Sequence, residues 1–199
     1  FRSTRNIAKG DFDNDGHMDV VVNNYVITTS NSYTFFKGLG NGKFDPTTIS
    51  GNGSKQANDI AAHDFNADGN LDIVLAEFNG VTVYFGQGNG SFTLNATYVN
   101  GTYAKYMDIS DVNNDGAMDI VFTVGLGSNS FQVLYGSTGS PGTFTVSTNF
   151  AINGAHTDLK VADMNGDGFK DVITTGIYLS QNYIGVALNN SGSPGTFST

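Results

Sequence analysis

The stretch DFDNDGHMDVVV at residues 11–22 places four aspartates within nine residues and then runs directly into three valines. The same pattern returns three times without gaps, as DFNADGNLD from Asp64, DVNNDGAMD from Asp111 and DMNGDGFKD from Asp163. Successive copies begin 53, 47 and 52 residues apart. A recurring period of this length indicates an array of structural repeats.

The residues around each acidic segment predict strands. A short apolar run rich in β-branched residues follows every copy, which is typical of a buried strand. A second apolar stretch then ends in a turn rich in Gly, Asn or Ser before a phenylalanine, as in TFFKGLGNGKF and VTVYFGQGNGSF, and predicts a β-hairpin. One further strand fits ahead of the acidic loop. Four-stranded units that repeat every 40 to 50 residues or so are typical of β-propeller blades.

We therefore predict an all-β fold, a β-propeller-type array of four four-stranded antiparallel blades. No linker or shift in composition divides the chain, so residues 1–199 are expected to form a single β-propeller domain. The repeats are expected at approximately 1–52, 53–101, 102–153 and 154–199, the last of them truncated.

The acidic residues are concentrated in the four nine-residue segments, which hold 13 of the 18 Asp and Glu residues. Carboxylates this close repel one another unless a cation neutralises them, and ligands that are all oxygens favour a hard ion, Ca²⁺ before Mg²⁺. The alternate spacing turns the side chains at loop positions 1, 3, 5 and 9 inward. The backbone carbonyl of position 7 would be a further ligand, and the glycine at position 6 permits the turn.

An EF-hand is the obvious alternative, because its loop opens with the same DxDxDG pattern. It also requires a bidentate Glu at position 12 and a helix on either side. Position 12 is occupied here by Val22, Leu75, Phe122 and Thr174. The sequence therefore excludes an EF-hand in all four copies.

The pattern DxDxDGxxD, followed by a hydrophobic strand and a later glycine-rich hairpin, resembles the FG-GAP/VCBS repeats of integrin alpha-subunit propellers and their extracellular relatives. The resemblance covers nearly the whole chain, although repeat 4 reads ALNNSG where the hairpin glycine is expected. It implies four calcium sites, one in each repeat. The implied ligands, with the carbonyl at position 7, are Asp11, Asp13, Asp15, His17 and Asp19; Asp64, Asn66, Asp68, Asn70 and Asp72; Asp111, Asn113, Asp115, Ala117 and Asp119; and Asp163, Asn165, Asp167, Phe169 and Asp171.

The number of repeats departs from the family pattern. Family propellers usually close with seven blades, and this chain has four repeats. The expectation is therefore either a closed four-bladed ring or part of a larger propeller. The resemblance also implies an extracellular or cell-surface location, with any signal or anchor outside this segment.

The composition argues against nucleic acid and membranes as partners and against several kinds of catalytic site. Nine basic residues against 18 acidic ones do not provide the positive surface that nucleic acid requires, and no apolar run is long enough to insert into a membrane. The chain has no cysteine, no HExxH and no GxSxG motif, and calcium would claim most of the paired carboxylates. We therefore expect no enzymatic activity.

The function expected from these features is a non-catalytic, calcium-binding module for adhesion or for recognition of a protein or a glycan, in which calcium is structural. One alternative is a lectin with sugar sites between blades, for which loop tyrosines would provide stacking surfaces. Another is an accessory region of a larger secreted enzyme. Five N-x-S/T sequons, at Asn52, Asn89, Asn95, Asn100 and Asn189, are compatible with a secreted glycoprotein.

Overall fold

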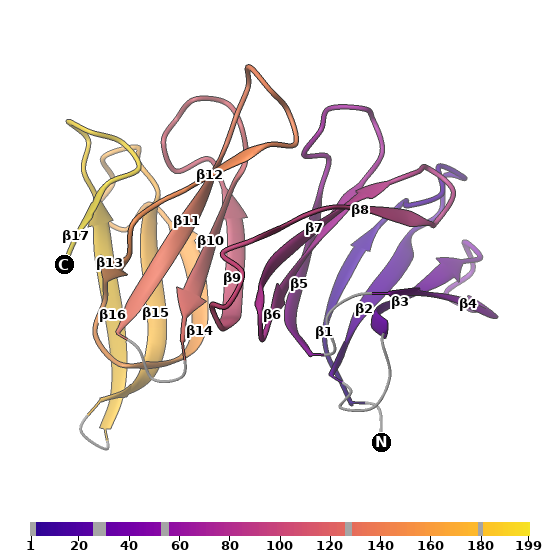
Figure 1. Ribbon diagram of the computed structural model, residues 1–199, viewed down its shortest axis with the longest axis horizontal. Helices are drawn as coiled ribbons and strands as arrows, with labels where there is room; N and C mark the ends of the chain where they lie inside the picture. The colour runs from indigo at the N-terminus through magenta and orange to yellow at the C-terminus, as the bar shows by residue number, and fades with distance from the viewer. Residues whose placement is uncertain (1–2, 26–30, 53–55, 126–128, 179–180) are drawn as a thin grey trace. The chain divides into compact units, whose positions relative to one another are not determined.

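The computed structural model describes residues 3–25, 31–52, 56–125, 129–178 and 181–199, and contains only strands and turns over these ranges (Figure 1). The strands form four antiparallel sheets, here called sheets 1 to 4 in chain order. Each sheet follows the chain from strand to neighbouring strand, which is the up-and-down order of a propeller blade. The all-β prediction with four-stranded antiparallel units is confirmed, whereas ring closure and the number of blades remain predictions.

The two N-terminal sheets have four strands each. Sheet 1 contains β1 (Ser3–Gly10), β2 (Asp19–Tyr25), β3 (Asn31–Gly38) and β4 (Phe44–Asn52). Sheet 2 contains β5 (Ala57–His63), β6 (Asp72–Glu77), β7 (Gly80–Gly86) and β8 (Phe92–Tyr98).

The two C-terminal sheets have shorter last strands. Sheet 3 contains β9 (Ala104–Ser110), β10 (Asp119–Val124) and β11 (Ser130–Gly136), and two short strands, β12 (Phe144–Val146) and β13 (Phe150–Ala151), both pair with β11. Sheet 4 contains β14 (Ala155–Ala162), β15 (Asp171–Tyr178), β16 (Gln181–Asn189) and β17 (Phe197–Ser198). The fourth strand predicted for repeat 3 is thus split in two.

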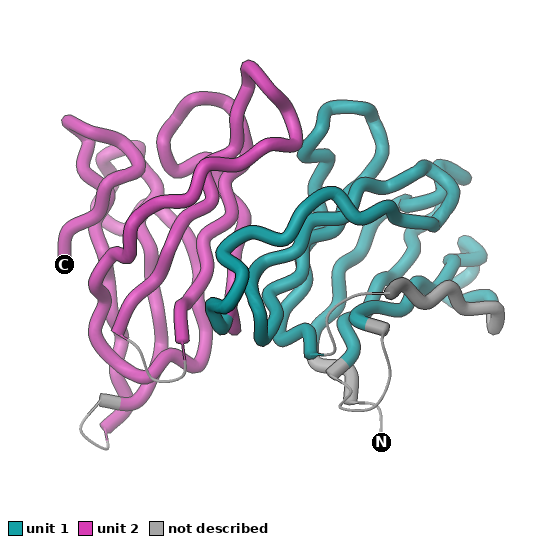
Figure 2. Tube along the Cα trace, viewed as in Figure 1, with its two compact units in different colours: residues 1–103 teal, residues 104–199 magenta. Residues whose placement is uncertain are grey.

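The chain divides into two compact units, residues 1–103 and 104–199, coloured separately in Figure 2. The first unit contains sheets 1 and 2, and the second contains sheets 3 and 4. The assignment of both units to a single domain remains a prediction.

The second strand of each sheet is the most deeply buried, as its apolar sequence predicts. Every residue of β6 is buried, whereas the edge strand β8 is largely exposed. In the first unit the core packs Phe12, Tyr33 and Phe35 of sheet 1 and its loop against Ile73 and Tyr84 of sheet 2. In the second unit, Val121 and Phe131 of sheet 3 share a core with Val172 and Ala187 of sheet 4. Apolar packing between neighbouring sheets therefore stabilises each unit.

Candidate metal centres and their anchoring

Four loops of the same conformation connect the first and second strands of the four sheets, and we call them loops 1 to 4. The glycine at position 6 has a φ of 86° to 89° in every loop, at Gly16, Gly69, Gly116 and Gly168. A Cβ at Gly16 would meet nothing within 4 Å, so the backbone conformation and not crowding requires glycine there. Position 4 is also left-handed, and in loop 2 an alanine, Ala67, adopts a φ of 59°. The sequence did not predict this second left-handed position.

The aspartates at positions 1 and 5 hold each loop in shape. In loop 3, Asp111 accepts the backbone N–H groups of Asp115 at 3.2 Å and Gly116 at 2.8 Å. Asp115 in turn accepts the N–H of Ala117, the position 7 residue, at 2.8 Å. Loops 1 and 2 repeat all three bonds, and loop 4 differs only in that Asp163 accepts from Gly166 and Gly168. The loop backbone thus curls around the carboxylates.

Position 3 separates loop 1 from the other three. In loops 2, 3 and 4 it is an asparagine, whose amide donates to the position 5 aspartate at 2.9 to 3.0 Å. In loop 1 it is Asp13, and Asp11, Asp13 and Asp15 each offer one carboxylate oxygen within 4.8 Å of the others. The Asp13 side chain is 10% exposed, and its Oδ1 atom is buried without a hydrogen-bond partner.

Lys37, on β3, provides a cation for this extra carboxylate. Its ammonium contacts the Asp13 carboxylate and lies 2.5 Å from Asp15 Oδ2. The lysine holds the pKa of Asp15 down, to about 2, and the two carboxylates raise the pKa of Lys37. In the other sheets, the position of Lys37 is occupied by Phe85, Tyr135 and Leu188. Each of these residues comes directly before the residue whose backbone N–H bonds to the position 9 aspartate. Sequence reasoning did not identify Lys37 as part of the site.

The position 9 aspartates also bond each loop to its sheet. Asp19, Asp72, Asp119 and Asp171 are fully buried. In each, Oδ2 accepts the N–H of the position 2 residue at 2.8 to 2.9 Å, and Oδ1 accepts an N–H at the end of the third strand at 2.7 to 2.9 Å. One carboxylate therefore ties the loop to both the second and the third strand of its sheet.

The hydrogen bonds of these carboxylates offset only part of the free-energy cost of burying their charge. Desolvation raises the pKa of both Asp72 and Asp119 to about 6, against the lowering effect of the backbone N–H donors. A positive ion beside the loop would stabilise their ionised form.

The described geometry fits a hard cation. All the donors are carboxylate, carboxamide or carbonyl oxygens, the buried Asp13 Oδ1 atom has no partner, and the loop backbone is already curled around the site. Coordination by the twenty residues named from the sequence remains a prediction.

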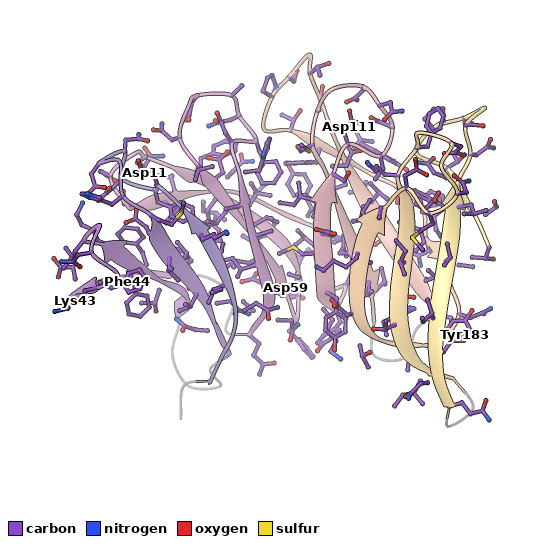
Figure 3. The ribbon with its side chains drawn as sticks, turned by 180° about the vertical axis from the view of Figure 1, so that it is seen from behind. Asp11, Lys43, Phe44, Asp59, Asp111 and Tyr183 are labelled. Atoms are coloured by element: carbon purple, nitrogen blue, oxygen red, sulfur yellow. The ribbon has the colours of Figure 1, made fainter. Side chains whose placement is uncertain are left out.

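The tyrosines that the sequence places near strand ends or loops, where they could stack on a sugar, lie in different environments; they are Tyr25, Tyr33, Tyr98, Tyr103, Tyr106, Tyr178 and Tyr183. Tyr33 is 3% exposed and packs edge-on against Tyr84 and Phe92, so its ring is part of the core. Tyr103 packs against Phe78, whereas Tyr106 and Tyr183 are half-buried. Figure 3 labels Tyr183 on β16. The side chains of Tyr25 and Tyr178 lie outside the described residues.

Among the sequons, Asn189 is buried and its amide donates to the carbonyls of Val112 at 2.7 Å and Lys170 at 2.9 Å. A glycan could not be attached there without breaking these bonds. Asn89, Asn95 and Asn100 are exposed, and the side chain of Asn52 lies outside the described residues.

Comparison with known proteins supports this reading of the repeats. A family model described as an FG-GAP-like repeat matches residues 11–75, 64–122 and 111–174. A search of curated proteins found no match. No helix in the described part of the chain is long and apolar enough to span a membrane.

Two solved structures match this chain at low sequence identity. A lectin from Agrocybe aegerita, whose structure is described as the basis of specific recognition of non-reducing terminal N-acetylglucosamine, matches with a TM-score of 0.61 and 20% identity. The match covers 96% of this chain and 50% of the lectin chain. The Photorhabdus luminescens Tc holotoxin pore matches with a TM-score of 0.48 and 17% identity, over 90% of this chain and 9% of that one.

Proposed function

Because the chain belongs to the FG-GAP-like repeat family, we propose that it is a non-catalytic recognition module of β-propeller type whose four acidic loops bind structural calcium. The observation that carries the calcium proposal is loop 1. Three carboxylates converge there, and a nine-tenths buried carboxylate oxygen has no hydrogen-bond partner. The Lys37 ammonium pairs with the other oxygen of this carboxylate, Oδ2, and leaves Oδ1 without a partner. A calcium ion bound at Oδ1 would offset the remaining cost of burying it.

Calcium would supply positive charge at the centre of each loop. The side chains at positions 1, 3 and 5 and the carbonyl at position 7 would hold the ion, with the position 9 aspartate at its edge. The position 9 carboxylate connects the loop to the sheet, since it accepts backbone N–H groups from the loop and from the third strand. A loop ordered by calcium would therefore also stabilise the sheet. Binding energy would thereby become folding energy, because the unfolded loop is a poor site.

Thermal unfolding in calcium and in EDTA, followed by far-UV circular dichroism, tests this proposal. We expect a higher midpoint in calcium that rises with its concentration, and a smaller effect of magnesium at equal concentration. Equal midpoints in calcium and in EDTA would overturn the calcium proposal and leave the fold assignment intact.

The location and the type of ligand follow from the same proposal. Calcium at the concentrations that such loops need is found outside cells, so we place the module there, in adhesion or in recognition of a protein or glycan. An accessory role within a larger secreted enzyme is the alternative. Adding the module to a candidate partner domain and measuring turnover would distinguish the two.

A lectin function is the second candidate, and the structural similarity to the Agrocybe aegerita lectin favours it. Terminal N-acetylglucosamine is the first sugar to test on a glycan array. Sugar binding that disappears in the Tyr183→Ala or Tyr106→Ala variants while the circular dichroism spectrum is unchanged would support it. Tyr33→Ala, which alters a core ring, is the matched control for unfolding.

A further inference from the structure

Loops 1 and 2 lie in the same compact unit, coloured teal in Figure 2, and a hydrogen bond joins them. The side-chain amide of Asn14, at position 4 of loop 1, donates to Oδ1 of Asn70, at position 7 of loop 2, over 2.8 Å. The two residues lie 56 positions apart in sequence. The bond is therefore a contact between neighbouring repeats and not part of either loop alone.

Each end of this bond lies beside predicted calcium ligands. Asn14 stands between Asp13 and Asp15, at positions 3 and 5 of loop 1. The backbone N–H of Asn70 donates to Asp68 Oδ1 at 2.7 Å, and the Asn70 carbonyl is the ligand predicted at position 7 of loop 2. Because both residues belong to the curled part of their loops, the bond favours the state in which both loops are ordered at once.

The hairpin turn of sheet 2 closes over the bonded pair. A Cβ at Gly88 would lie 2.4 Å from Asn70 Oδ1 and 2.7 Å from Asn14 Nδ2. Both distances are too short for a real Cβ, so the turn fits against the pair only because residue 88 is glycine. In the same turn, the N–H of Gly90 donates to the carbonyl of Phe12 in loop 1 at 3.0 Å. Loop 1, loop 2 and this turn thus form one contiguous network within the first unit.

Loops 3 and 4, in the second unit, cannot form the same bond. Position 4 of loop 3 is again an asparagine, Asn114, and its φ of 58° equals that of Asn14. Position 7 of loop 4 is Phe169, whose side chain has no acceptor atom. The chain therefore contains one pair of loops with the link and one pair without it.

We propose that Asn14 is a positioning residue for the calcium site of loop 2, and that its bond to Asn70 couples calcium binding in loops 1 and 2. This inference rests on the proposed calcium function. Coupling between two sites is reciprocal, so calcium in each loop strengthens binding in the other by the same factor. A hydrogen bond of ordinary strength changes an equilibrium constant by about two- to tenfold, and this one is solvent-exposed, so we expect a factor of about two to five.

Two substitutions already present elsewhere in the chain remove the bond. Asn70→Ala gives loop 2 the position 7 residue of loop 3, Ala117, and keeps the backbone carbonyl. Asn14→Ala gives loop 1 the position 4 residue of loop 2, Ala67, which adopts the same left-handed conformation with a φ of 59°. Neither substitution changes the charge of the chain, so repulsion between bound calcium ions is the same in every variant.

A calcium titration of the intact chain, followed by ¹⁵N–¹H correlation spectra, measures the affinity of each loop separately. The position 6 glycines report on their own loops, because each donates its N–H to the position 1 aspartate; they are Gly16, Gly69, Gly116 and Gly168. Asn70→Ala should weaken calcium binding in loop 1, and Asn14→Ala should weaken it in loop 2, each about two- to fivefold. The substituted residue lies outside the loop whose affinity changes, so a purely local structural role would not produce this result.

The double variant and a control complete the experiment. Asn14→Ala combined with Asn70→Ala should weaken neither cross-loop affinity further, because both substitutions remove the same bond. Asn114→Ala is the matched control and should leave the affinities of loops 1, 2 and 4 unchanged. Glycine amides that respond to calcium with unchanged cross-loop affinities in both single variants would overturn the coupling and leave the calcium function intact. Amides that do not respond to calcium in any loop would overturn both.

Discussion

Asn189 provides a quantitative test of how the loops and sheets are tied together. Its amide donates to the carbonyls of Val112 and Lys170, and its Oδ1 atom accepts the N–H of Gly195 at 2.9 Å. Its own N–H donates to Asp171, and that bond survives a side-chain substitution. Asn189→Ala therefore removes three buried or half-buried hydrogen bonds and leaves their partners unsatisfied.

Each lost bond costs about 1 kcal/mol, so Asn189→Ala should reduce the free energy of unfolding by about 3 kcal/mol. Asn189→Asp keeps the acceptor and loses both donors, and it adds a charge beside Asp171, so it should be at least as destabilising. Ser191→Ala removes the sequon without touching the amide and is the matched control.

Urea unfolding followed by far-UV circular dichroism measures the total change, and hydrogen exchange locates it. We expect faster exchange in sheets 3 and 4, with the amides of sheets 1 and 2 much less affected. A loss below about 1 kcal/mol for Asn189→Ala would refute the reasoning that these bonds hold sheet 4 on loop 3.

Three further predictions concern the loops. Lys37→Met should tighten calcium binding in loop 1 several-fold, because the ammonium no longer competes with calcium for Asp13 and Asp15. Terbium luminescence measures the affinity, and Lys43→Met is the control. Asp115→Ala should lower the melting midpoint in EDTA, because the hydrogen bonds from Ala117 and Asn113 are lost, and should lower it further in calcium. Hydrogen exchange should become faster mainly in sheet 3, and an equal loss in both buffers would count against a ligand role. In EDTA, burial raises the pKa of Asp72 in the folded chain to about 6, from 3.8 in the unfolded chain, so the folded state holds the proton more tightly. The free energy of unfolding should therefore fall by about 1.4 kcal/mol per pH unit as the pH rises from about 4 to about 6. The difference in unfolding free energy between the wild type and Asp72→Asn should follow this slope, and a flat difference would contradict it.

The sequence predicted the strands and the loops because both depend on local chemistry. The glycine at position 6 and the apolar run after position 9 determine the turn and the buried strand in each repeat, and sheets 1, 2 and 4 follow that plan. The fourth strand of repeat 3 is split because its residues pair with β11 at two separate places, Phe144–Val146 and Phe150–Ala151. Pairing between distant segments is not visible in a local pattern.

The roles that depend on contacts across the fold were not predicted. Position 9 was expected only as a ligand, and its bonds to the end of the third strand require residues such as Gly136 that lie 17 positions away in sequence. Lys37 is likewise 22 residues from Asp15. A signal was present in the sequence, since loop 1 has an extra aspartate and only its repeat has a lysine before the hairpin glycine.

Calcium stoichiometry tests the central claim most directly. Native mass spectrometry of the intact chain, after dialysis against calcium and then against EDTA, counts the bound ions. Four acidic loops predict four calcium ions per chain, removable by EDTA and poorly replaced by magnesium. A chain that retains its β-sheet spectrum and binds no calcium would contradict the claim.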